Sequence, residues 1–111
     1  MVIAFDDFLR VDVRTGTIRE VHEFPQARKP AFKLLVDFGE EIGTKWSSAQ
    51  ITTLYGAQEL VGRQVVAVVN FAPKRIAGFS SEVLVLGVPD GSGEVVLLQP
   101  ERRVADGVRV Y

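Results

Sequence analysis

Large apolar residues occupy every second position from Phe32 to Phe38, with Lys33 between the first two of them. A period of two is typical of a β-strand that turns one face toward a core. The pattern therefore predicts a strand over residues 32–38, with Lys33 on the face away from the core.

The segment from Val65 to Gly87, VVAVVNFAPKRIAGFSSEVLVLG, contains two apolar runs separated by a polar and basic loop. The runs at 65–69 and 83–88 have no polar face, which predicts two strands that are covered on both sides. Loops held between buried strands carry function more often than other loops do. We therefore expect ligand-binding residues in the loop between these runs.

Two further strands are predicted nearer the N-terminus. The alternation between residues 11 and 21 changes phase near Gly16, which predicts a bent first strand with a β-bulge at that glycine. Residues 42–48 alternate so that Trp46 shares the apolar face and the polar face ends in Ser47 and Ser48. Trp46 is accordingly expected in the core.

Residues 51–61 have helical spacing and are followed by Gly62, which predicts a short helix that ends there. Residues 89–93 predict a turn before a last strand over 95–98. This order predicts an all-β fold: a five-stranded OB-fold Greek-key barrel, with a short helix between strands 3 and 4 and terminal extensions. A Greek-key sandwich is the alternative, and the single helix argues against it.

Both ends of the chain carry large apolar residues. The first ones surround Asp6, a candidate helix cap, with the spacing of one helical turn. Such residues either pack on the core of their own domain or form a subunit interface, and small domains leave surfaces of this kind uncovered. The residues that would enter a dimer interface are Ile3, Phe5, Phe8, Val108, Val110 and Tyr111.

The 111 residues predict one domain, 1–111, of ordinary globular composition. The absence of cysteine excludes disulfides and suits a reducing cytoplasm. Acidic residues precede any apolar stretch and no apolar run approaches the length of a spanning helix, so neither a signal peptide nor membrane insertion is expected. The net charge of −1 argues against a protein that coats nucleic acid by charge alone, so a polyanion site must be a local patch.

In the predicted barrel, basic residues from separate segments converge on the ligand-binding side. The candidate RNA- or peptide-binding residues are Arg28, Lys29, Lys33, Lys45, Ser47, Ser48, Asn70, Phe71, Lys74, Arg75, Phe79, Ser81 and Glu82. Lys74 and Arg75 lie between Pro73 and Gly78, which restrict the loop, so the pair could contact phosphates instead of being merely solvated. The serines and Asn70 could equally satisfy backbone groups.

Catalysis has little support in the sequence. The single histidine, His22, lies in a polar loop with no nucleophile suggested nearby, and no metal-ligand spacing occurs. We therefore expect neither an enzyme nor a metal or cofactor site.

Four segments together resemble the tRNA-binding domain family: VDVRTGTI at 11–18, FPQARKPAFKLLVDFG at 24–39, SSAQIT at 47–52 and ELVGRQVVAVVNFAPKRIAGFSSEVLVLG at 59–87. That family includes C-terminal extensions of some methionyl-tRNA synthetases, small free-standing tRNA-binding proteins and a bacterial secretion chaperone. ARKPAFKL, SSAQIT and the Ser81-Glu82 pair are similar to the chaperone branch.

The resemblance implies an OB-fold homodimer joined partly through its terminal segments. It also implies a chaperone role in protein export, with unfolded or precursor polypeptides as partners, and possible contact with tRNA. Two functions follow from it: a polypeptide-binding chaperone or a structure-specific tRNA-binding protein. The slightly acidic charge balance favours the first.

Overall fold

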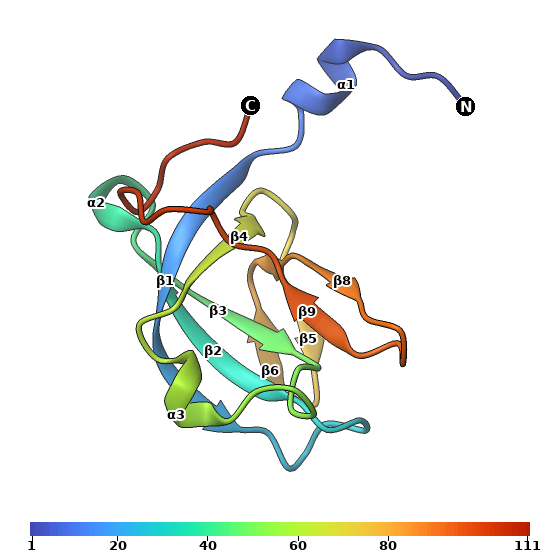
Figure 1. Cartoon of the computed structure of the whole chain (residues 1–111), viewed down its shortest axis with the longest axis vertical. Helices are drawn as coiled ribbons and strands as arrows, with labels where there is room; N and C mark the ends of the chain where they lie inside the picture. The colour runs from blue at the N-terminus through green and yellow to red at the C-terminus, as the bar shows by residue number, and fades with distance from the viewer.

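The first strand, β1 (Val13–Glu23), pairs with different partners along its length. In the computed structural model, which describes residues 1–111, its first half pairs with β4 (Gln64–Val68) and its second half with β2 (Phe32–Asp37). The free edge of its first half bonds to the C-terminal tail, with a bridge between Arg14 and Arg109. One bent strand therefore joins both sides of the molecule (Figure 1).

The main sheet is a nearly closed antiparallel barrel, in which β3 (Thr44–Ala49) follows β2, and β7 (Leu84–Val85) follows β4. Two hairpins are added: β5 (Lys74–Ile76) with β6 (Phe79–Ser81), and β8 (Gly87–Pro89) with β9 (Val95–Leu97). The helical turns are α1 (Phe5–Leu9), α2 (Gly39–Ile42) and α3 (Ala57–Leu60). This confirms the predicted five-stranded OB-type barrel, with α3 between the third and fourth strands.

Side chains close the barrel between β3 and the end of β6. The Glu82 amide donates to the Trp46 carbonyl at 2.8 Å, and the Glu82 carboxylate accepts from the Trp46 amide at 3.0 Å. The Ser81 hydroxyl accepts from the Ser48 amide at 3.0 Å. One backbone hydrogen bond, one carboxylate and one hydroxyl thus take the place of a full strand ladder along this seam.

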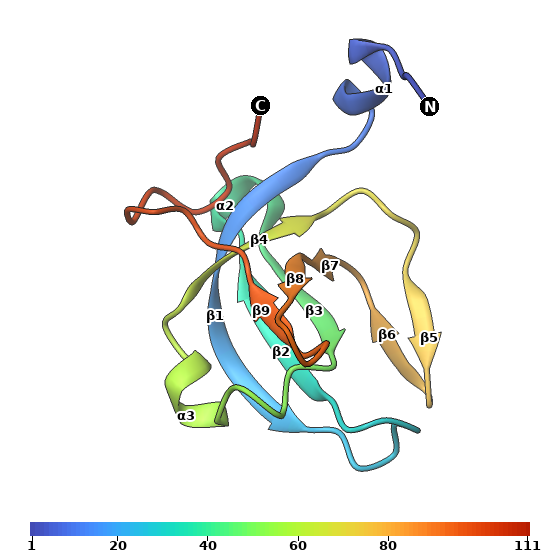
Figure 2. The same ribbon diagram turned by 45° about the vertical axis from the view of Figure 1, so that its right-hand side comes forward.

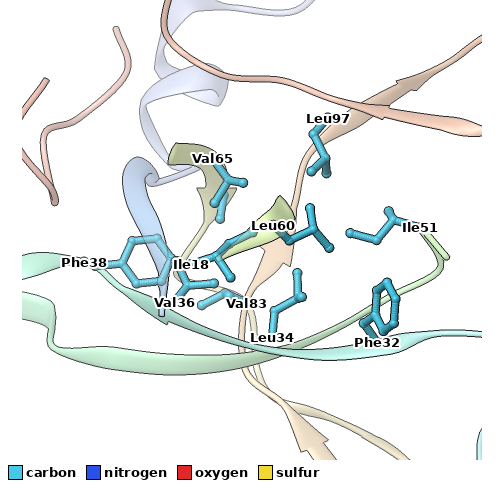
Figure 3. Close-up of a cluster of buried hydrophobic side chains, with 11 residues drawn as sticks. Ile18, Phe32, Leu34, Val36, Phe38, Ile51, Leu60, Val65, Val83 and Leu97 are labelled. Carbon is cyan, nitrogen blue, oxygen red and sulfur yellow. The ribbon is translucent and has the colours of Figure 1, made fainter. Parts of the chain in front are cut away.

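The core fills the barrel interior, where Leu34, Val36 and Leu60 are fully buried (Figure 3). Alternate residues of β2 point inward, which confirms the period of two. Leu60 comes from α3 and is part of this core. Burying a side chain of this size contributes about 1.5 to 3 kcal/mol. The complete cluster is Ile18, Phe32, Leu34, Val36, Phe38, Ile51, Leu60, Val65, Ala67, Val83 and Leu97.

The predicted position of the β-bulge is wrong. The pairing of β1 with β2 shifts between Ile18 and Glu20, not at Gly16. Gly16 serves packing instead, since a Cβ there would lie 2.7 Å from Val36 and 2.8 Å from the Phe38 ring. Gly16 and Ile18 face the core, whereas Thr15 and Thr17 between them bond to the C-terminal tail, so both faces of this part of β1 are covered.

The predicted faces of β3 are reversed. Ser47 is 1% exposed and pairs with buried Leu34, whereas Trp46 pairs with Leu35 on the outer face and does not belong to the core cluster. The core accepts Ser47 because its hydroxyl donates to the Val83 carbonyl at 3.0 Å. The expectation of Trp46 in the core is therefore wrong.

The stretch 83–88 is also not the covered strand that its apolar run predicts. Val83 is buried, but Leu84 is 48% exposed and Val88 is exposed as well. Only Leu84 and Val85 pair in the main sheet, and the chain then leaves it to form β8. The loop predicted before this stretch contains the β5–β6 hairpin, which stands to one side of the barrel (Figure 2).

A polar network fixes the C-terminal tail, residues 104–110, to β1 and β4; we call this contact the tail seam. The Asp106 carboxylate accepts from the Thr17 hydroxyl at 2.6 Å and from the Gln64 amide at 3.3 Å. It also pairs with Arg19 at 3.5 Å. The Val108 carbonyl accepts from the Thr15 amide at 3.1 Å. The tail is thus held by hydrogen bonds, while several of its apolar side chains face outward.

The N-terminal helix α1 projects from the barrel and contains no buried residue (Figure 1). Phe5 is 71% exposed, so it does not pack on the core of its own domain. That packing was one of the two interpretations of the sequence. The helix begins after Ala4, whose amide donates to the Asp7 carboxylate at 3.0 Å. Asp6 is therefore not the cap.

Candidate functional site

An apolar hollow of about 460 Å³ lies between the end of β3, the β5–β6 hairpin and β9. Ten of its fifteen lining residues are hydrophobic. Phe71, 53% exposed, and Leu84 keep much of their apolar surface open to solvent. The lining residues are Ser48, Ala49, Gln50, Ile51, Phe71, Ala72, Lys74, Ile76, Ser81, Glu82, Val83, Leu84, Val85, Val95 and Leu97.

A second hollow, of about 810 Å³, lies between the loop after β1 and the same hairpin. Four cationic side chains and no carboxylate line it. We call it the basic hollow, and its lining residues are Ala27, Arg28, Lys29, Ala31, Ser48, Gln50, Lys74, Arg75, Ile76 and Ala77.

The two hollows share a wall. Ser48 and Gln50 from the end of β3, and Lys74 and Ile76 from β5, line both of them. We call the β5–β6 hairpin, residues 74–81, the arm. Any ligand large enough to fill both hollows must pass this wall, so the position of the arm sets the shape of both.

The positive charge of the basic hollow is not neutralised by neighbouring side chains. Arg28, Lys29, Lys74 and Arg75 are exposed, and none of them forms an ion pair within 4.0 Å. Arg75 donates to the Gly78 carbonyl at 2.9 Å, a neutral acceptor within the arm. Unpaired cations around one hollow attract anionic groups.

The tip of the arm is a tight turn. Ala77 has φ of 48° and Gly78 has φ of 82°, a left-handed conformation that is uncommon for alanine. This turn reverses the chain directly after Lys74 and Arg75, so both cations project from a short and restricted hairpin.

The hollows bring together eight of the residues that the sequence predicts for the site. Arg28, Lys29, Ser48, Lys74 and Arg75 line the basic hollow, and the apolar hollow adds Phe71, Ser81 and Glu82 while it shares Ser48 and Lys74. Lys33, Lys45, Ser47, Asn70 and Phe79 line neither hollow.

Several of these polar side chains make structural hydrogen bonds. The Asn70 amide accepts from the Asp12 backbone at 2.9 Å and donates to the Arg10 carbonyl at 2.8 Å, which ties the chain before β1 to the end of β4. Lys45 lies 3.9 Å from the Glu82 carboxylate beside the closing seam. These bonds explain why polar residues stand at these positions.

Lys33 and Phe79 meet on the outer face of the barrel. The Lys33 ammonium lies 4.8 Å from the centre of the Phe24 ring and 5.1 Å from that of Phe79. The Phe79 ring also packs edge-on against Trp46, with centres 5.9 Å apart, and against Phe24, with centres 5.4 Å apart. We call these four residues the aromatic clamp.

Apart from Phe71, the apolar residues of the site were not predicted from the sequence. Leu84 and Val85 line the apolar hollow, but their run at 83–88 was interpreted as a covered strand, and Ile76 in the loop before it was not selected. One signal could have identified them. Only a few residues separate position 83 from the turn at 89–93, and this short stretch contains both the last strand of the main sheet and the first strand of a hairpin.

The structure gathers no group of three or more His, Asp or Glu side chains that could hold a metal ion. His22 lies 2.9 Å from Glu20 and packs beside the Trp46 ring. No helix has both the length and the apolar character needed to span a bilayer.

The sequence profile of the putative tRNA binding domain matches residues 13–109. The chain belongs to the tRNA-binding domain family. The matched range contains all of the barrel strands, both hairpins and the two hollows.

Within the tRNA-binding domain family, two solved structures are similar over the whole chain. The chaperone CsaA from Bacillus anthracis is 52% identical with a TM-score of 0.94, and the match covers 100% of both chains. The CsaA chaperone protein from Picrophilus torridus is 49% identical with a TM-score of 0.93, covering 99% of this chain and 100% of that one. They confirm the predicted resemblance to the chaperone branch.

A methionine–tRNA ligase from Pyrococcus abyssi is 38% identical over 110 residues, which is 99% of this chain and 15% of the ligase. One from Porphyromonas gingivalis is 35% identical and likewise covered over 15% of its length. The chain thus spans less than a sixth of these curated relatives. Their similarity concerns one domain of a larger enzyme.

Proposed function

We propose that this protein is a chaperone that binds unfolded or precursor polypeptides in the apolar hollow and acts in protein export from the cytoplasm. The observation that carries the proposal is an open hollow whose lining is two-thirds hydrophobic, at ten of fifteen residues. Open apolar surface of this kind marks interaction sites in otherwise soluble proteins. Similarity to two CsaA chaperones over the whole chain supports it.

The lining suits an extended chain of varied sequence. Phe71 and Leu84 offer apolar contacts, while Ser48 and Gln50 place polar groups beside them. Apolar burial is non-directional, so it can stabilise many different side chains. Such a site binds polypeptides by their exposed apolar segments and not by one sequence.

Leu84→Asp tests this proposal. Leu84 is half exposed, so the change should leave the fold intact, whereas a carboxylate in the apolar hollow should weaken binding of a permanently unfolded, carboxymethylated polypeptide by about tenfold, or 1.4 kcal/mol. Fluorescence anisotropy of the labelled polypeptide measures the affinity. Leu98→Asp is the matched control, because Leu98 is also exposed but lies outside the hollow. Equal affinities for the two variants would contradict the proposal.

The second candidate function is structure-specific tRNA binding. The specific observation that favours it is the basic hollow, with four unpaired cations and no carboxylate. The match to the tRNA-binding profile supports it as well. The two functions differ in their response to salt: binding through phosphates weakens steeply as salt rises, whereas binding through apolar contacts changes little.

We further propose a homodimer that uses the two terminal segments. Both ends of the chain lie at the same end of the molecule (Figure 2), and both expose apolar side chains, among them Phe5 and Tyr111. Burying them against a second copy would remove this surface from water. Light scattering at micromolar concentration should give the mass of a dimer, and Phe5→Asp should halve it. A monomeric mass for the unmodified protein would exclude this arrangement.

A further inference from the structure

The arm needs an anchor between its base and its tip. Its base is fixed by the closing bonds of Ser81 and Glu82, and its tip is the exposed turn at Ala77 and Gly78. Between these points, Phe79 places its ring against Phe24 and Trp46 of the barrel. The aromatic clamp is therefore the contact that holds the middle of the arm.

Lys33 is placed to hold the clamp and not to bind a ligand. Its side chain is partly buried, it lines neither hollow, and its ammonium lies within about 5 Å of two ring centres, inside the range of a cation–π interaction. One ring, Phe24, belongs to the barrel side and the other, Phe79, belongs to the arm. A cation that lies over both rings attracts both.

We propose that Lys33 is a positioning residue: by holding the Phe24 and Phe79 rings together it fixes the arm, and through the arm it sets the wall that both hollows share. The proposal rests on the proposed function, because ligand binding is one of its readouts. Lys74 and Arg75 would then contact ligand directly, while Lys33 acts on ligand only through their placement.

The single tryptophan gives a readout that does not depend on any ligand. Trp46 is the only tryptophan of the chain and its ring packs on Phe79. Lys33→Met keeps the aliphatic stem and removes the charge, so it should loosen the arm and shift Trp46 emission to longer wavelength. Lys33→Arg keeps a cation over the rings and should restore the original emission.

Binding measurements separate positioning from contact. Lys33→Met should weaken binding of the carboxymethylated polypeptide about three- to tenfold, and Lys33→Arg should recover it. With total tRNA as the polyanion probe, Lys74→Ala should lower the slope of log affinity against log salt by roughly one, because one phosphate contact is lost. Lys33→Met should weaken the affinity without changing that slope.

Coupling between the clamp residues provides the decisive check. Phe79→Leu removes the ring but keeps an apolar side chain, and it should reproduce the effect of Lys33→Met. The double variant should add little to either single one, since both break the same contact. Fully additive effects would overturn the proposal, as would unchanged Trp46 emission in Lys33→Met or a salt slope lowered as in Lys74→Ala. If the unmodified protein binds neither probe, the proposed function fails, while Trp46 emission still tests the anchoring of the arm.

Discussion

The arginines of the tail seam and the cations of the basic hollow have the same charge but different neighbours. Arg14 lies 2.7 Å from the Asp12 carboxylate, and Arg19 bridges Asp37 and Asp106 at 3.3 and 3.5 Å. The hydrogen bond to Asp12 raises the pKa of Arg14 above its ordinary value, against the opposing effect of burial. At the tail seam, the arginines pair with carboxylates of the same chain and so stabilise the fold.

No carboxylate lines the basic hollow, so the positive charges of its four cations have no ionic partner there. The net charge of −1 averages over both regions and conceals this asymmetry. Pairing, and not the number of basic residues, therefore separates cations that support the fold from cations available to a ligand. Two variants test this difference, one in the tail seam and one in the arm.

On the tail side, Asp106→Ala should lower the free energy of unfolding by about 1 to 3 kcal/mol, because it leaves the Thr17 hydroxyl without its acceptor. It also removes one of two acceptors of the Gln64 amide and one of the two carboxylates that Arg19 bridges. Urea denaturation measures the change. Glu101→Ala is the control: it removes the same charge from an exposed pair with Arg102 and should cost less than about 0.5 kcal/mol. Similar losses in both variants would show that Asp106 does not organise the seam.

On the arm side, the double change Lys74→Ala and Arg75→Ala should alter the free energy of unfolding by less than about 0.5 kcal/mol, because neither residue forms an ion pair. It should nevertheless reduce retention of tRNA in a gel shift, since two candidate phosphate contacts are lost. Unchanged retention would remove the arm from the RNA site, and a large loss of stability would mean that these cations support the fold after all.

The strands of the barrel were predictable where the alternation of apolar and polar residues alone decided which side chains are buried. Residues 32–38 keep a strict period of two because β2 is covered by core on one face only. The same rule gives the wrong faces for β3. Ser47 can be buried because its hydroxyl donates to a carbonyl, and Trp46 can lie on the outer face because its ring packs in the aromatic clamp. Both exceptions depend on contacts with segments more than thirty residues away, which local patterning does not contain.

The basic half of the site was predictable for a similar reason. Arg28 and Lys29 come together with Lys74 and Arg75 because the barrel order places the loop after β1 beside the arm. The apolar half was not, because the run at 83–88 looks like a covered strand when only composition is read. Leu84 shows the difference: the sheet ends there, and its side chain lines a hollow instead of a core.

The seam closed by Ser81 and Glu82 has an evolutionary consequence. A backbone ladder tolerates many side chains, but two of the three hydrogen bonds of this seam come from the Ser81 and Glu82 side chains, and both residues also line the apolar hollow. A mutation at either position therefore changes the closure of the barrel and the ligand surface together. Substitutions at Phe71 and Leu84 can change the ligand surface with the least effect on the fold, because these side chains are exposed to solvent.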